Sequence, residues 1–122
     1  LNGQSLNKNF FKIIYNYQIS KLFDFLTPTR TTFNGNNSSA WKEDIVNAKG
    51  FDERMEYGGL DCELGYRLGN NGIRSIQIRN RSTVLHLYHT RPYKNKEAIK
   101  VNRKIRENTL RNNIVFTEYG LK

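Results

Sequence analysis

Apolar positions that recur every three or four residues predict four helices separated by polar turns. They are expected over residues 8–26, 42–49, 60–68 and 94–112. In the first, apolar side chains cover much of the circumference, which favours a well-buried packing helix over one lying on a membrane surface. Pro28 is expected to end that helix. In the last, basic residues surround an apolar face marked by Ala98, Val101 and Ile105.

Shorter apolar runs predict strands over residues 73–79 and 83–89, joined by a turn that would let them pair, and a short strand beginning at residue 30. The order of elements predicts a mixed α/β fold. A length of 122 residues suits one compact domain. We divide it into an N-terminal helix and linker (1–30), a central region (31–93) and a C-terminal region with a basic helix (94–122). Because the first residue is Leu1, we expect a fragment of a longer protein.

Side chains in the predicted helix 60–68 receive simple structural interpretations. Its three leucines recur every four residues and predict a buried stripe. Glu63 and Arg67 stand four positions apart, which predicts a surface ion pair worth about 0.3–0.5 kcal/mol. Cys62 is read as a small, half-buried side chain rather than a nucleophile. Upstream, Trp41 is expected in the core, with a stacking platform for a ligand as the alternative.

Charge is unevenly distributed along this chain, whose formal net charge is +9. Residues 31–68 carry four basic and seven acidic side chains, whereas the segments on either side are basic. An acidic centre between basic arms is suited to proton abstraction or metal binding, while the arms would attract phosphates, nucleic acid or an anionic membrane. No apolar run reaches the ~18 residues that a spanning helix needs.

Asp61 is the candidate for acid–base chemistry. It follows Gly58 and Gly59 and opens a predicted helix. Glycines permit turns closed to other residues and let a ligand approach closely. The helix dipole favours an ionised carboxylate at this end, and a positioned carboxylate can accept a proton from a sugar hydroxyl. The competing interpretation is an ordinary acidic residue at a helix start.

His86 and His89 are the candidate metal ligands, since neutral imidazole binds divalent cations. Side chains three positions apart in a strand point to opposite faces, so both bind one ion only if the strand ends or bends between them. One ligand is therefore favoured over two. A structural or surface histidine is the alternative, because no cluster of carboxylates follows His86.

The string GGLDCELGYRL at residues 58–68 resembles the Gly-Gly-acid-acid-x-acid-x-x-x-Arg-Leu block of GT-A galactosyl- and N-acetylgalactosaminyltransferases, and is most similar to bacterial family 2 glycosyltransferases. Upstream, FNGNNSSAWK at residues 33–42 resembles the family's loop of asparagine, small, aromatic and basic residues. Downstream, VLHLYHTRPY at residues 84–93 resembles its His-Leu-x-His-x-Arg-x-Tyr segment. The three blocks occur in the family's order.

This resemblance implies the acceptor-side, C-terminal half of a GT-A fold, from an enzyme that builds a bacterial surface polysaccharide. It assigns Asp61 as the base that deprotonates the acceptor for inverting attack on a nucleotide-diphosphate sugar. His86 or His89, with His86 favoured, would hold a divalent metal, Mn²⁺ or else Mg²⁺. The implied substrate-binding residues are Asn36, Asn37, Trp41, Tyr57, Gly58, Gly59 and Arg91.

Implied partners are the sugar donor and a glycan or lipid-linked acceptor, in the cytoplasm or at the inner face of the plasma membrane, and no nucleic acid. Two departures matter. Leu60 stands where many relatives carry a carboxylate, and no Asp-x-Asp metal motif occurs. The nucleotide-binding half is thus expected to be absent and this fragment to be inactive alone. The alternative function is a basic, non-catalytic binding module for nucleic acid or an anionic membrane surface.

Overall fold

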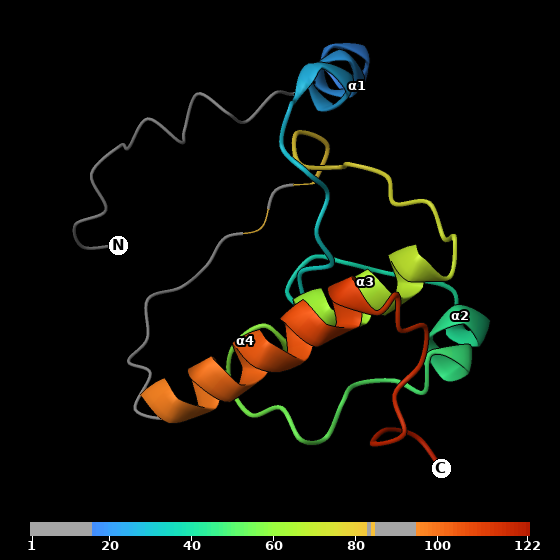
Figure 1. The fold of residues 1–122 in the computed structure, drawn as a ribbon. Coiled ribbons are helices and arrows are strands. Elements are labelled where there is room, and N and C mark those ends of the chain that lie inside the picture. The colour runs from blue at the N-terminus through green and yellow to red at the C-terminus, as the bar shows by residue number, and fades with distance from the viewer. Residues whose placement is uncertain (1–15, 83, 85–94) are drawn as a thin grey trace. The chain divides into compact units, whose positions relative to one another are not determined.

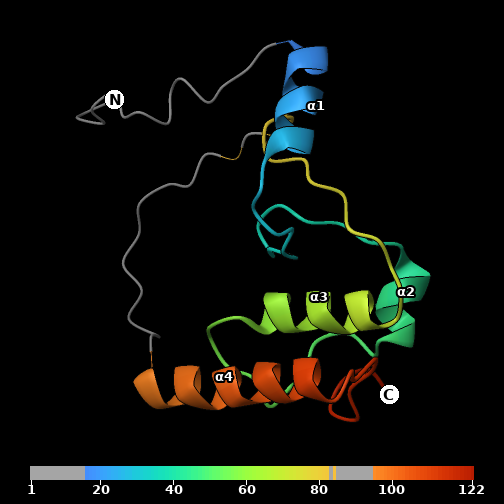
Figure 2. The same ribbon diagram turned by 45° about the horizontal axis from the view of Figure 1, so that its top comes forward.

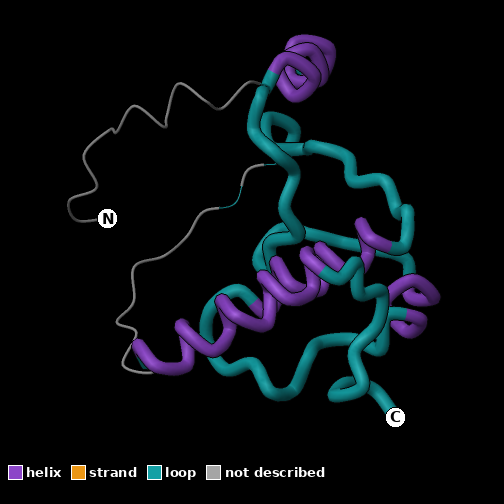
Figure 3. Tube along the Cα trace, in the orientation of Figure 1, coloured by secondary structure: helices purple, strands orange, loops and turns teal. Residues whose placement is uncertain are grey.

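The computed structural model describes residues 16–82, 84 and 95–122 (Figure 1). Within them the chain forms four α-helices and no strand, as the tube in Figure 3 shows. The helices are α1 (Tyr17–Leu26), α2 (Lys42–Asn47), α3 (Leu60–Asn70) and α4 (Lys96–Arg111). Each of the four predicted helices is present, and the described part of the chain is a small helical protein.

The chain divides into two compact units, residues 1–31 with 76–86 and residues 32–75 with 87–122. In the first, Asp24 of α1 accepts hydrogen bonds from the backbone N–H of Asn80 (2.8 Å) and from Nε of Arg81 (2.7 Å). Burial raises the pKa of Asp24, but these donors outweigh it and hold that pKa below its ordinary value. A buried carboxylate thus links α1 to the segment after residue 76.

Local sequence signals account for both ends of α1. The side-chain oxygen of Asn16 accepts hydrogen bonds from the N–H groups of Gln18 (3.0 Å) and Ile19 (3.2 Å), which caps the first turn. The helix ends at Leu26, as the position of Pro28 predicts. Residues 8–15 of the predicted helix lie outside the described residues.

The prediction that this helix is well buried is wrong for its described part. Phe25 is 85% exposed, and the buried residues of α1 are Ser20 and Asp24. The hydrogen bonds to Asp24 determine which side of the helix faces the rest of its unit. The covered side is therefore the polar one.

Glycines follow the ends of α2 and α3, at Gly50 and Gly72, whose φ angles of 65° and 81° lie in the left-handed region. After α3, the N–H of Gly72 donates to the carbonyl of Gly69 (3.0 Å) and that of Ile73 to the carbonyl of Leu68 (3.1 Å). This Schellman pattern satisfies carbonyls that the helix leaves free. Ile73 also packs against the core cluster that contains Leu68.

In the second unit, α3 and α4 pack side by side and run in the same direction (Figures 1 and 2). The predicted leucine stripe is confirmed at Leu64 and Leu68, which are buried. The predicted face of α4 is wrong at Val101, which is 50% exposed, because the buried residues of α4 are Asn102 and Thr109. Polar side chains with specific partners, described below, occupy much of the space between the two helices.

The strand predicted over residues 73–79 is not formed, and neither is the short strand predicted from residue 30. A strand needs a partner for its backbone groups, and no described segment pairs with either one. The second predicted strand, 83–89, lies outside the described residues apart from Val84. None of the helices in the described ranges is both long and apolar enough to cross a lipid bilayer.

Candidate functional site

Asp61 lies in the first turn of α3, against the loop that carries the asparagines. Its Oδ2 accepts a hydrogen bond from the N–H of Gly35 (2.9 Å), and its Oδ1 accepts one from the N–H of Cys62 (2.8 Å). The loop approaches closely, since a Cβ at Gly35 would lie 3.6 Å from Cβ and Oδ2 of Asp61. The two donors orient a partly exposed carboxylate, and each oxygen keeps a lone pair for another donor.

The turn before Asp61 needs its two glycines. Gly58 and Gly59 have φ angles of 116° and 85°, which side chains disfavour, so the predicted glycine turn is confirmed. The turn is covered by α4. The side-chain N–H₂ of Asn102 lies 3.0–3.3 Å from the carbonyl oxygens of residues 56–58, and a Cβ at Gly59 would lie 2.9 Å from Nη1 of Arg106.

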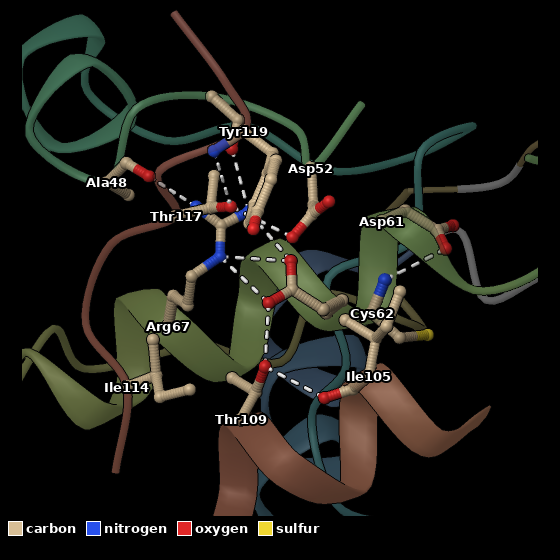
Figure 4. A network of polar contacts seen from close by, with 12 residues as sticks. Ala48, Asp52, Asp61, Cys62, Arg67, Ile105, Thr109, Ile114, Thr117 and Tyr119 are labelled. Carbon is tan, nitrogen blue, oxygen red and sulfur yellow. Dashed lines mark hydrogen bonds and ion pairs between the residues drawn. The ribbon is translucent and has the colours of Figure 1, made fainter. Parts of the chain in front are cut away.

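Behind this end of α3 lies a buried polar network (Figure 4). The Nε of Arg67 donates to both carboxylate oxygens of Glu63 at 2.9 Å, and Nη2 donates to Oε2 at 2.7 Å. The same guanidinium donates to the carbonyls of Ala48 and Gly50. The hydroxyl of Thr109, on α4, donates to Glu63 Oε1 at 2.9 Å. One ion pair thus connects α3 to α4 and to the end of α2.

The prediction of a surface ion pair between Glu63 and Arg67 is therefore wrong, because both residues are buried, with exposures of 1% and 0%. The spacing of four residues is as predicted. The pair can be buried because two backbone carbonyls and the hydroxyl of Thr109 replace its hydrogen bonds to water. These partners lie 17 to 46 residues away in the sequence, so the local spacing does not predict them.

A second buried carboxylate, Asp52, fixes the C-terminal segment. It accepts hydrogen bonds from Nε and Nη2 of Arg54 (2.9 and 2.7 Å) and from the hydroxyl of Thr117 (2.8 Å). Burial raises the pKa of Asp52, but these donors outweigh it and hold that pKa below its ordinary value. The Arg54 guanidinium also lies over the ring of Tyr119, 3.7 Å from its centroid.

The structure brings some predicted substrate-binding residues together and leaves others apart. Asn36 and Asn37 follow Gly35, which contacts Asp61, and Tyr57 precedes the glycine turn. Trp41 is 79% exposed at the start of α2, so its placement in the core is wrong. The predicted ligands His86 and His89 and the predicted diphosphate contact Arg91 lie outside the described residues.

No group of three or more histidine, cysteine, aspartate or glutamate side chains in the described ranges could hold a metal ion. An open depression of about 660 Å³ lies between residues 52–54, the end of α4 and residues 113–119. None of the described residues that were predicted to bind substrate lines it. Asp61 and its neighbours therefore remain the candidate site in the described part of the chain.

Two residues near Asp61 were not singled out from the sequence, Asn102 and Arg106. They lie four positions apart on the inner side of α4, among the basic residues that surround its predicted apolar face. The charge of Arg106 reaches the thiol of Cys62. Burial and the charge of Asp61 raise the pKa of Cys62, and Arg106 partly offsets that rise.

Comparison with known proteins places this chain in no family. No protein-family model matches it, and no curated protein and no solved structure is similar enough to count as a match. The chemistry of the site therefore has to be argued from its own residues.

Proposed function

We propose that this chain is the acceptor-side part of an inverting glycosyltransferase, with Asp61 as the general base. The observation that carries the proposal is the pair of N–H groups, from Gly35 and Cys62, that orients a partly exposed carboxylate at the start of α3. The adjoining loop is rich in asparagine, whose amide both donates and accepts hydrogen bonds, as a hydroxyl-rich ligand requires. The resemblance of residues 33–93 to family 2 enzymes points to the same chemistry.

In the proposed step, a carboxylate oxygen of Asp61 takes the proton of the acceptor hydroxyl while that hydroxyl's oxygen bonds to the anomeric carbon of the donor sugar. The bond between the anomeric carbon and the donor's phosphate oxygen breaks, and the nucleoside diphosphate leaves with the electron pair. Attack opposite the leaving group inverts the configuration at the anomeric carbon.

Binding of the donor belongs to the same proposal, with a nucleotide-binding half supplied outside these 122 residues. A divalent metal held with the help of His86 or His89 would neutralise the leaving diphosphate. The acceptor is proposed to be a glycan or a lipid-linked sugar at the inner face of the plasma membrane.

The test is Asp61→Asn in the full-length protein. Amide for carboxylate preserves size, so the expected result is a loss of about 10²–10⁴-fold in the rate of sugar transfer, measured with labelled nucleotide sugars. Asp44→Asn is the matched control, because Asp44 is also a partly exposed acid in the first turn of a helix. It should leave the rate unchanged.

If Asp61→Asn kept full transfer activity, Asp61 would not be the general base. Absence of transfer altogether, together with salt-sensitive binding of nucleic acid or anionic vesicles, would favour the binding module instead. For nucleic acid, the logarithm of the affinity should fall by about one unit per phosphate contacted for each tenfold rise in salt concentration. Circular dichroism of each variant shows whether the fold survives the substitution.

A further inference from the structure

A guanidinium lies beside the candidate base. The Nη1, Cζ and Nε atoms of Arg106 lie 2.9–3.1 Å from where a Cβ of Gly59 would be. The charge of the same side chain acts on the thiol of Cys62. Gly59 and Cys62 stand on either side of Asp61 in the sequence, so Arg106 lies at the end of α3 where the carboxylate is.

Arg106 has no carboxylate partner in the described part of the chain. The ion pairs found there join other residues, and Nε of Arg106 is buried without an acceptor. One turn earlier on α4, Oδ1 of Asn102 is buried without a donor, in a side chain that is 1% exposed. Leaving a buried polar group unsatisfied is unfavourable. Both atoms are enclosed by protein, but Arg106 as a whole is only half-buried, so part of its side chain is accessible to a ligand.

No ion pair joins Asp61 and Arg106 in the described part of the chain, although both act on the thiol of Cys62 through their charges and through hydrogen bonds. The N–H groups of Gly35 and Cys62 occupy one position on each oxygen of Asp61 and hold the carboxylate in place. Arg106 in turn is held against the turn at Gly59. A fixed carboxylate and a fixed guanidinium, near each other but unpaired, can each serve a different group of one ligand.

We propose that Arg106 binds an anionic group, a carboxylate or phosphate, of the acceptor whose hydroxyl Asp61 activates. The inference rests on the proposed function. Inverting attack places the acceptor and the leaving diphosphate on opposite sides of the anomeric carbon, so a cation beside the base meets the acceptor. A guanidinium binds oxyanions through two parallel N–H donors.

The test measures binding without catalysis, by titration calorimetry on the full-length protein with three probes. They are methyl glucuronide, glucose 1-phosphate and the neutral methyl glucoside. We expect an anionic probe to bind more tightly than the neutral one, and Arg106→Gln to weaken only the anionic probe, by roughly tenfold to a hundredfold. Whichever anionic probe binds more tightly identifies the oxyanion as a sugar carboxylate or a phosphate.

Two further variants keep the result interpretable. Arg103→Gln removes a basic side chain that is exposed on α4 and paired with Glu107, and should leave affinity unchanged. Arg106→Lys keeps the charge but loses the fork of donors, and should bind with intermediate affinity. It also serves as the measured variant if Arg106→Gln does not fold.

Equal affinity for charged and neutral probes, binding of none of them, or full affinity in the folded Arg106 variant would each overturn the inference. These outcomes are separate from those for Asp61. Loss of transfer in Asp61→Asn with unchanged anion affinity in Arg106→Gln would leave the glycosyltransferase proposal standing without the anionic acceptor. The reverse pattern would leave an anion site without the proposed base.

Discussion

The guanidinium of Arg67 donates to both carboxylate oxygens of Glu63, and neither side chain reaches solvent. The remaining N–H groups of Arg67 reach backbone carbonyls at the end of α2, and Glu63 also accepts the hydroxyl of Thr109. Two charges can be buried in a small domain only when such partners replace the lost water. The pair therefore fixes α3 against α4 and against the residues that follow α2.

Arg67→Met should destabilise the protein by about 3–5 kcal/mol, because it leaves the carboxylate of Glu63 buried without its counter-charge. The free energy of unfolding in urea, monitored by circular dichroism, measures this loss. Thr109→Val removes a single hydrogen bond from the same carboxylate and should cost only about 1 kcal/mol.

Arg103→Met is the matched control for that prediction. Arg103 and Glu107 on α4 have the same spacing of four residues and an N–O distance of 2.8 Å, but both side chains are exposed. Pairs of this kind contribute about 0.2–1 kcal/mol. A loss for Arg67→Met as small as that for Arg103→Met would show that the buried network is not formed in solution.

Two glycines in α3 should respond oppositely to alanine. A Cβ at Gly65 would lie 2.5 Å from Cβ of Phe33, whereas a Cβ at Gly69 would meet nothing within 4 Å. Gly65→Ala should therefore destabilise the protein by about 1–3 kcal/mol through overpacking. Gly69→Ala should stabilise it by about 0.5–1 kcal/mol, since alanine loses less backbone entropy in a helix. Melting temperatures of the two variants, compared with the unmodified protein, check both signs.

Local features of this fold could be predicted from the sequence, and partner-dependent ones could not. The helices, the end of α1 before Pro28 and the glycine turn before Asp61 depend on a few neighbouring residues, and these predictions are confirmed. Burial was mispredicted wherever a polar side chain meets a distant partner. Glu63 accepts the hydroxyl of Thr109 across 46 residues, and the amide N–H₂ of Asn102 donates to carbonyls 44 to 46 residues away, so no local pattern contains that information.

The same distinction applies to the candidate site. Asp61 was found from its position at a helix start, but its contact with the N–H of Gly35 spans 26 residues. Arg106 was not singled out because it is one of several lysines and arginines on α4, and nothing in the neighbouring sequence distinguishes it from the others. Asparagine at 102, one helical turn earlier, was a weak signal that this side of α4 faces protein.

Acid should lower the free energy of unfolding, partly through protonation of Asp52. Its pKa is held below the ordinary value of 3.8, because hydrogen bonds from Arg54 and Thr117 outweigh the opposing effect of burial. The contribution to stability is therefore complete above the unfolded pKa of 3.8 and is lost as the pH falls through the lower folded pKa. Thr117→Val removes one of the donors to the carboxylate.

The variant should accordingly lose less stability than the unmodified protein when the pH falls from about 6 to about 3. Urea unfolding at both pH values measures the two losses, and their difference cancels groups that titrate alike in both proteins. An identical loss in the two proteins would mean that the hydroxyl does not bind Asp52.

Alkylation of Cys62 tests whether Asp61 and Arg106 both lie beside it. Burial and the charge of Asp61 raise the pKa of the thiol above its ordinary 9.0, while Arg106 acts in the opposite direction. Since the thiolate is the reacting form, Asp61→Asn should speed reaction with iodoacetamide and Arg106→Gln should slow it. Initial rates between about pH 7 and 9, followed by mass spectrometry, give the comparison.

The opposite signs make this experiment informative about geometry. Any loosening of the fold would expose Cys62 and speed alkylation in both variants, so a slower rate in Arg106→Gln cannot arise from local unfolding. Faster reaction in both variants would indicate damage to the turn at Gly59, and unchanged rates in both would place the two charges too far from the thiol to act. A faster rate for Asp61→Asn with a slower one for Arg106→Gln would place a carboxylate and a guanidinium within reach of one ligand, independently of any assay of sugar transfer.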